Sequence, residues 1–190
     1  QVEHTVTEEV WGVDLVQTQL LGELPNGASP RGAAIQLRVN LETMTGDGSA
    51  KPGGGTLTAF EPPTGPGVRV DAYGYAGYRT NPNFDSLLAK VIVHGATCEA
   101  ALKRAGRALA AFRLEGAPSN IAFLRALLED KEFRADKVHT RFIDERAAKL
   151  VEAATKYEKA PTSTTRPQAG ARVDAVDPLA VLAFGKTSRG

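Results

Sequence analysis

The chain has 190 residues, of which 42% are hydrophobic and 24% are charged, so it can bury the core of one domain or of two small ones. Its 23 Lys and Arg almost balance its 22 Asp and Glu, and a net charge of +1 argues against nucleic-acid or anionic-membrane partners. Cys98 is the only cysteine, which excludes an internal disulfide and a multi-cysteine zinc site. This usage favours a reducing compartment, the cytoplasm or, in a eukaryote, the mitochondrial matrix.

The first 32 residues predict two short helices and a loop. Thr5-Val6-Thr7-Glu8 matches a capping box, with Thr5 at the N-cap, and Gly12 interrupts the helix that follows. Asp14 can cap a second helix that runs to Gly22. Residues 22–32 are dense in Gly, Pro, Asn and Ser, so we expect a loop there.

The period then changes to that of β-strands. Apolar Ile35, Leu37, Val39 and Leu41 alternate with polar residues, which predicts a half-buried strand. Three more strands are predicted at 56–60, 68–73 and 86–95, the last with Leu87, Ala89, Val91 and Val93 on one face. Residues 46–55 are expected to form a long flexible loop.

Helical periodicity follows the last strand. From Thr97 onward, one apolar stripe contains Ala101, Leu102, Ala105, Ala108, Leu109 and Phe112. Residues 113–118 read as an extended link, Ser119 as the cap of another helix, and a charged helix should run to about Tyr157. Strands followed by helices indicate an α+β fold, with a mainly antiparallel sheet and flanking helices. Residues 31–143 carry enough of these elements for an independent core.

The candidate chemistry is sparse when it is judged from residue types alone. The sequence lacks GxGxxG, P-loop, HExxH and GxSxG motifs, and its three histidines have no metal-ligand spacing. Arg38 lies on the polar face of a predicted strand, as either a solvated side chain or an anion-binding guanidinium on a rigid base. Asp85 reads as a cap or turn residue that could also pair with a functional arginine. Glu3 is one carboxylate near the start of the chain.

Taken together, the segments resemble biotin carboxylases. QVEHTVTEEVWGVDLVQTQL, which begins at Gln1, resembles the segment that closes the ATP-grasp region of these enzymes. RGAAIQLRVNLE, GPGVRVDAYGYAGY, NPNFDSLLAKVIVHG and RLEGAPSNIAFLRALL resemble the C-terminal domain of that family, in the same order. The resemblance implies that residues 1–30 end the ATP-grasp region and that 31–145 form the C-terminal domain. Residues 146–176 would be a helix and linker, and 177–190 would start a following domain. The chain would then begin inside an active site, as part of a longer enzyme.

The family's reaction uses ATP, Mg²⁺ and bicarbonate to carboxylate N1 of biotin carried on a carrier domain. By resemblance, Glu3 is the general base that deprotonates bicarbonate, while Gln1 and Val2 help to hold this anion. Arg38 corresponds to an arginine that binds bicarbonate and stabilises the oxyanion of biotin, and Asp85 to an aspartate close to it. Phe142 aligns with an apolar residue of the adenine pocket.

The resemblance also implies partners and leaves alternatives open. The Mg²⁺ ligands, the nucleotide-binding lysines and the biotin attachment site are not in this sequence, so this chain alone should be inactive. Its expected partners are the N-terminal ATP-grasp part, the biotin carboxyl carrier domain, the carboxyltransferase domain and further copies in a homo-oligomer. The final carboxyl acceptor stays open between an acyl-CoA and pyruvate. The alternative is a non-catalytic structural or dimerisation module, with residues 65–71 at a subunit interface. Ala33 and Gln36 replace a histidine and a glutamate that are common in the family.

Overall fold

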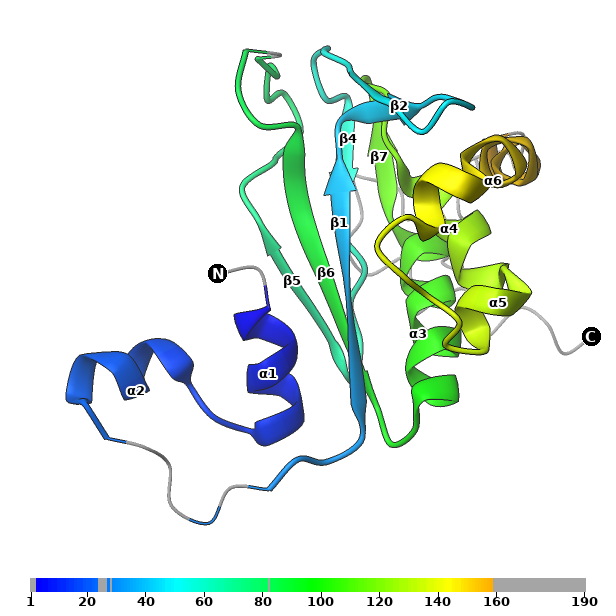
Figure 1. Cartoon of the computed structure of the whole chain (residues 1–190). Coiled ribbons are helices and arrows are strands. Elements are labelled where there is room, and N and C mark those ends of the chain that lie inside the picture. Colours follow the sequence, from blue (N-terminus) through cyan, green and yellow to red (C-terminus); the bar gives the residue numbers. More distant parts are fainter. Residues whose placement is uncertain (1–2, 24–26, 28, 82, 159–190) are drawn as a thin grey trace, which may run out of the picture. The chain divides into compact units, whose positions relative to one another are not determined.

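The computed structural model describes residues 3–23, 27, 29–81 and 83–158, all within one compact unit, Gln1–Ala160 (Figure 1). Its helices are α1 (His4–Trp11), α2 (Leu15–Leu21), α3 (Cys98–Ala111), α4 (Ile121–Glu129), α5 (Lys131–Arg134) and α6 (Phe142–Glu158). Its strands are β1 (Ala33–Asn40), β2 (Glu42–Met44), β3 (Ala50–Pro52), β4 (Ala59–Glu61), β5 (Val68–Ala72), β6 (Leu87–Gly95) and β7 (Arg113–Glu115). Every strand pair is antiparallel, which confirms the α+β prediction.

The central layer is a three-stranded sheet in the order β1-β6-β5. β6 lies in the middle and is buried along most of its length, because it has a neighbouring strand on each side. β1 pairs with β6 from Ala33 opposite Gly95 to Val39 opposite Ala89, and the register then shifts so that Asn40 faces Leu87. Leu88 is thereby left out of the pairing, as in a β-bulge.

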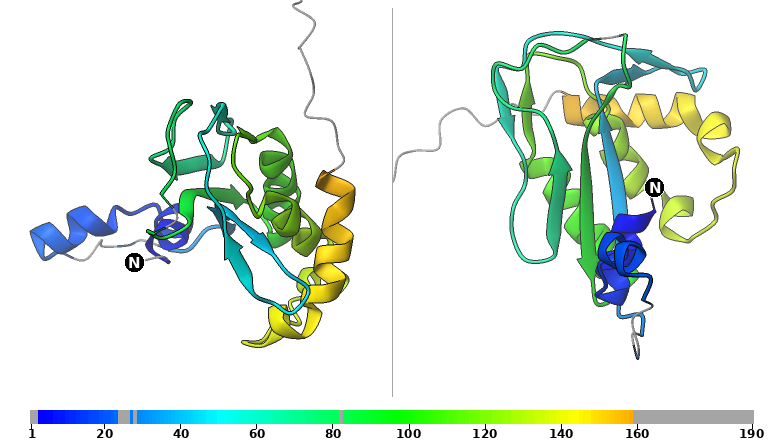
Figure 2. Two further views of the ribbon diagram at one scale, coloured as in Figure 1. Left: turned by 90° about the horizontal axis from the view of Figure 1, so that it is seen from above. Right: turned by 90° about the vertical axis from the view of Figure 1, so that its left-hand side faces the viewer.

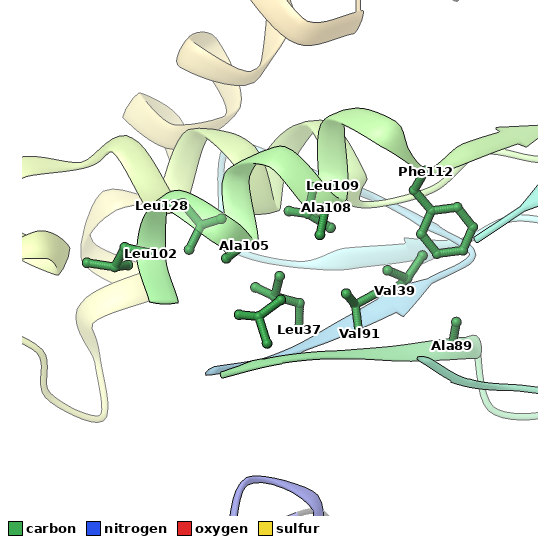
Figure 3. Close-up of a cluster of buried hydrophobic side chains, with 11 residues drawn as sticks. Leu37, Val39, Ala89, Val91, Leu102, Ala105, Ala108, Leu109, Phe112 and Leu128 are labelled. Atoms are coloured by element: carbon green, nitrogen blue, oxygen red, sulfur yellow. The ribbon is translucent and has the colours of Figure 1, made fainter. Parts of the chain in front are cut away.

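The main core fills the space between this sheet and α3. Figure 3 shows Leu37, Val39 and Val91 of the sheet lying against Ala105 and Leu109 of the helix. The apolar stripe predicted from Thr97 to Phe112 is therefore confirmed, and the Thr97 side chain caps α3 by accepting a hydrogen bond from the Ala100 amide. α4 packs beside α3, and α6 packs on α4, so helices cover one face of the sheet (Figure 1).

α1 lies on the other face of the sheet, where it contacts β1 and β6 (Figure 2, right). Thr5 is fully buried there, and its hydroxyl donates a hydrogen bond to the Gln36 side-chain oxygen on β1. The capping-box prediction was wrong: the N-cap position is Glu3, which makes no side-chain capping bond, and Thr5 faces the sheet instead. The predicted Gly12 stop and Asp14 cap are both confirmed.

A second, smaller cluster consists of Leu41, Leu57 and Leu88, and it lies under the loops before β6. The predicted strand at 56–60 is reduced to β4, which pairs with β7 in the segment expected to be only an extended link. The predicted loop at 46–55 contains one side of the β2–β3 hairpin, so that expectation was also wrong. The Asp47 carboxylate organises this turn by accepting bonds from Thr45 and Ser49.

The remaining helices differ from the prediction at one boundary. α4 has Asn120 at its N-cap position, not Ser119, and the Asn120 side chain makes no capping bond. The charged helix, α6, ends at Glu158, close to the expected Tyr157. It crosses the expected boundary between 145 and 146, so the domain limits stay predictions. The expected linker beyond α6 and the segment 177–190 lie outside the described residues.

Candidate active site

Arg38 lies on the α1 side of β1, opposite Lys90 of β6. Its guanidinium Nη2 is 3.9 Å from Oδ2 of Asp85, with 41% of the arginine side chain and 72% of the aspartate side chain exposed. The Nε atom of Arg38 is buried and has no hydrogen-bond partner among the described residues. The strand thus fixes the base of the side chain, while its terminal nitrogens remain accessible to an anion.

Asp85 precedes β6 and is held by its own local geometry, since its Oδ1 accepts a hydrogen bond of 2.8 Å from the Leu87 amide. It borders a small pocket with an aromatic lining that includes Tyr73, Tyr78 and Phe84. Burial raises the pKa of Tyr73, and its contact with Tyr78 and the charge of Asp85 add to that effect. The fold therefore brings two of the predicted site residues, Arg38 and Asp85, together beside a polar and aromatic surface.

Glu3 occupies the N-cap position of α1, and its backbone oxygen accepts a hydrogen bond of 3.2 Å from the Thr7 amide. The contact between Thr5 and Gln36 holds this helix on β1, and Gln36 is two residues before Arg38 on the same face of the strand. The N-terminal end of α1 is therefore attached to the strand that carries Arg38. Gln1 and Val2 lie outside the described residues.

A cluster of charged side chains around Arg69 also holds α1 on the sheet. Arg69 of β5 donates hydrogen bonds to Glu8 of α1 at 2.8 Å and to Asp71 at 2.9 and 3.1 Å, and Glu9 is 3.6 Å away. Hydrogen bonds from the Arg69 guanidinium lower the pKa of Asp71, and hydrogen bonds to Asp71 and Glu8 raise the pKa of Arg69. Lys90 approaches the other side of Asp71, at 4.0 Å.

Phe142 lies on the helical side of the sheet, at the start of α6 (Figure 1). Its ring is buried, packs against Phe133 and lies under the guanidinium of Arg146. The structure does not bring it together with Arg38 and Asp85, and its assignment to an adenine pocket stays a prediction.

Neither a metal site nor a membrane span is found within the described part of the chain. In residues 3–23, 27, 29–81 and 83–158, no three His, Cys, Asp or Glu side chains are grouped so as to hold a metal ion. No helix in the same ranges is both long and apolar enough to cross a membrane.

Sequence reasoning missed the residues that hold the end of β1. Asn120 was not singled out, although its side chain binds the backbone of Arg38 and Asn40. A buried asparagine just before a helix, with no capping bond, has no distinctive sequence signal. Glu42 and Ser86 are hydrogen-bonded to each other beside Asp85 and were also missed, because neither residue type has a distinctive sequence signal there.

The fold and this site define a class of α+β domain in which an arginine on a sheet face is paired with an aspartate before the central strand. Residues 36–145, more than half of the chain, match the family described as "Biotin carboxylase C-terminal domain". The chain belongs to this family.

Relatives extend the match beyond that domain. The chain is 41% identical over 180 residues to a biotin-dependent acyl-coenzyme A carboxylase alpha3 subunit of Mycobacterium leprae, covering 88% of this chain and 29% of that protein. It is 42% identical over 156 residues to mitochondrial pyruvate carboxylase of Homo sapiens, covering 76% of this chain and 13% of that protein. The chain thus spans less than a third of the length of either relative.

Solved structures agree with the sequence relatives. A single-chain, multi-domain long-chain acyl-CoA carboxylase is similar with a TM-score of 0.74 and 45% identity, covering 87% of this chain and 19% of that one. The biotin carboxylase domain dimer of the Hydrogenobacter thermophilus 2-oxoglutarate carboxylase has a TM-score of 0.71 and 34% identity, covering 79% and 34% of the two chains. That structure is a complex with MgADP, ADP and bicarbonate. The resemblance read from the sequence segments is confirmed.

Proposed function

We propose that this chain is the C-terminal part of a biotin carboxylase component, and that within the complete enzyme it contributes to the carboxylation of biotin by bicarbonate and ATP. The observation that carries the proposal is the pairing of Arg38 with Asp85 on one sheet face, in a chain of the biotin carboxylase family. ATP supplies the phosphoryl group that activates bicarbonate. The residues of this chain act on the anions.

In this proposal, Arg38 binds bicarbonate and stabilises the negative charge that develops on the biotin oxygen as N1 becomes nucleophilic. A guanidinium on a strand needs little rearrangement when that charge forms, and such a fixed donor contributes most in a site that excludes water. Asp85, at 3.9 Å, adds a weak electrostatic preference for one orientation of the guanidinium. The exposed nitrogens of Arg38 leave room for the substrate.

Glu3 is proposed as the general base that removes the proton of bicarbonate, because a carboxylate is ionised at neutral pH and can accept it. The docking of α1 on β1 through Thr5 and Gln36 supports this role, since it attaches Glu3 to the strand of Arg38. Gln1 and Val2 would complete the anion site. Phe142 is retained as a residue near the adenine, although it is buried on the helical side of the sheet.

Other parts of the enzyme must supply what these residues lack. We propose that an ATP-grasp part binds Mg²⁺ and the nucleotide, and that a biotin carboxyl carrier domain delivers biotin. A carboxyltransferase domain would then pass the carboxyl group to an acyl-CoA or to pyruvate, the acceptors named for the two relatives. A homo-oligomer with residues 65–71 at its interface is compatible with this arrangement.

The test uses the complete enzyme and separates the two half-reactions. Arg38→Gln should lower carboxyl transfer to biotin by about 10²–10³-fold, the usual cost of removing one oxyanion donor. The KM for ATP should stay within a few-fold of wild type, and Arg38→Lys should restore activity only in part, because an ammonium lacks the planar fork of a guanidinium. A large rise in the KM for ATP, with transfer and ATP cleavage falling together, would move Arg38 to nucleotide binding and contradict the proposal.

Glu3→Gln provides the second arm. It should lower bicarbonate-dependent ATP cleavage by about 10²–10⁴-fold, the range for loss of a general base. Exposed Glu158→Gln at the end of α6 is the matched control and should be neutral. Near-normal ATP cleavage by Glu3→Gln would remove Glu3 from the base role.

A further inference from the structure

Asn120 makes three hydrogen bonds to the end of β1. Its side-chain Nδ2 donates to the Arg38 carbonyl at 3.1 Å, its Oδ1 accepts from the Asn40 amide at 3.0 Å, and its own amide donates to the Asn40 carbonyl at 3.1 Å. The residue is 7% exposed and is 82 positions from Arg38 in the chain. A single buried side chain thus holds the backbone on both sides of Val39.

The place of these bonds in the sheet explains why an amide is used. β1 is an outer strand of the β1-β6-β5 sheet, so one row of its backbone groups has no neighbouring strand. The carboxamide of Asn120 carries one acceptor and a donor, as a peptide group does, and it binds the C=O and N–H that would otherwise be unpaired. It does so where the register of β1 on β6 shifts, between Val39 and Asn40. The side chain therefore fixes the strand at its least regular point.

The hydrogen bonds continue from β1 to the loop of Asp85. The Asn40 side chain donates to Glu42 Oε1 at 3.0 Å, and the Ser86 hydroxyl donates to Glu42 Oε2 at 2.7 Å. The Ser86 carbonyl also accepts from the Leu41 amide at 2.7 Å. Glu42 is buried, so its carboxylate depends on these donors. Because Ser86 follows Asp85 directly, one hydrogen-bonded cluster connects the backbone of both members of the Arg38–Asp85 pair.

We propose that Asn120 and Glu42 are positioning residues that set the geometry of Arg38 relative to Asp85. The inference rests on the proposed function for its kinetic consequences, but its structural content stands on these contacts alone. The pair cannot position itself, since both side chains are substantially exposed and a contact of 3.9 Å between exposed charges contributes little. The position of the Arg38 backbone, from which the guanidinium extends, is instead fixed by hydrogen bonds, and the Asn120–Glu42 cluster provides them.

The kinetic test uses the complete enzyme. Asn120→Ala should lower kcat for biotin carboxylation by about 10- to 100-fold, the scale for misplacing a reacting group by about 1 Å, and leave the KM for ATP nearly unchanged. Glu42→Ala should act in the same direction. Glu42→Gln should retain most of the activity, because a carboxamide can accept from Asn40 and donate to the Ser86 oxygen. Glu42→Gln as inactive as Glu42→Ala would overturn the hydrogen-bonding role.

Two comparisons separate positioning from a merely structural effect. Leu128→Ala truncates a buried core residue of the same helix, and it should lower the melting temperature without changing kcat at a temperature where the enzyme is folded. In an Arg38→Gln background, Asn120→Ala should cause no further loss of kcat, because the group that it positions is already gone. Equal losses of kcat in both backgrounds would overturn the proposal.

A third readout does not depend on activity. The buried Nε of Arg38 should give a protected Nε–Hε cross-peak in the NMR spectrum of the 190-residue chain, and Asn120→Ala should cause its loss at neutral pH through faster exchange. Leu128→Ala should leave the cross-peak in place. A cross-peak unchanged by Asn120→Ala would overturn the positioning role. If Arg38→Gln is active while Asn120→Ala abolishes the cross-peak, the proposed function fails and the positioning inference survives.

Discussion

Arg69→Met tests how α1 is held on the sheet. Methionine keeps much of the apolar stem but removes the cation that contacts all three carboxylates, Glu8, Glu9 and Asp71, and leaves only the more distant contact of Lys90 with Asp71 at 4.0 Å. A hydrogen bond between charged groups contributes about 1.5–3 kcal/mol. The Arg69 side chain is 35% exposed, so solvent screening reduces the combined contribution of its hydrogen bonds. We expect Arg69→Met to lower the free energy of unfolding by about 2 kcal/mol. For a chain of this size, this corresponds to a fall of roughly 4–8 °C in melting temperature.

The pH dependence gives the sharper assay. Arg69 lowers the pKa of Asp71, so this interaction contributes stability above the unfolded-state pKa of about 3.9, and the contribution is lost as the pH falls through the lower folded-state pKa. In urea unfolding, the free energy of unfolding of wild type should therefore exceed that of Arg69→Met by a larger amount at neutral pH than near pH 3.

Arg113→Met is the matched control for this experiment. Arg113 makes a similar fork to Glu115 and Glu61, at 2.9 and 2.6 Å, but its side chain is 45% exposed and that of Glu61 is 63% exposed. We expect a smaller destabilisation from this change, because the surrounding water screens the charges. The reasoning would be refuted if the loss of unfolding free energy in Arg69→Met were the same at both pH values. It would also be refuted if that loss at neutral pH were no larger than the loss in Arg113→Met.

Two further predictions concern stability. Gly106→Ala in α3 should stabilise the fold by up to about 1 kcal/mol, because the position is helical and a Cβ there meets no atom within 4 Å. Gly116→Ala should instead destabilise it strongly, since φ is +94° and the new Cβ would lie 2.0 Å from the Thr56 carbonyl oxygen, and chemical denaturation of both variants measures the contrast. The sequence predicts an independent core for residues 31–143, but most of the buried face of α6 lies beyond residue 143, so we expect a fragment of residues 31–158 to unfold cooperatively and 31–143 to be less stable. Equal thermal transitions for the two fragments would show that α6 adds nothing to the core.

The elements with a strong period were predictable from the sequence. β1 and α3 each bury one side, so their apolar residues recur at the spacing of a strand or a helix. The β2–β3 hairpin was missed because its strands have three residues each and β3 is exposed, so neither alternates clearly. Its pairing depends on the side-chain bonds of Asp47, which periodicity does not report.

The site was predictable one residue at a time, but not as an arrangement. Arg38 could be placed on the polar face of its strand, yet its contact with Asp85 depends on how two distant segments meet in the sheet. For Thr5, the local sequence predicts the wrong role. It fits a capping box, but the side chain is buried and hydrogen-bonded to Gln36 instead. The resemblance to biotin carboxylases supplied the pairing that spacing could not.

The two hydrophobic clusters differ in size, and we expect the smaller one to open at lower free energy than the larger one. β1, which carries Arg38, is anchored in the larger core, whereas Leu88, close behind Asp85, belongs to the small cluster with Leu41 and Leu57. Regions with few buried contacts open at lower free energy than the rest of a protein. We therefore expect a partial opening of the small cluster to displace Asp85 more than Arg38, because the strand of Arg38 packs on the larger core.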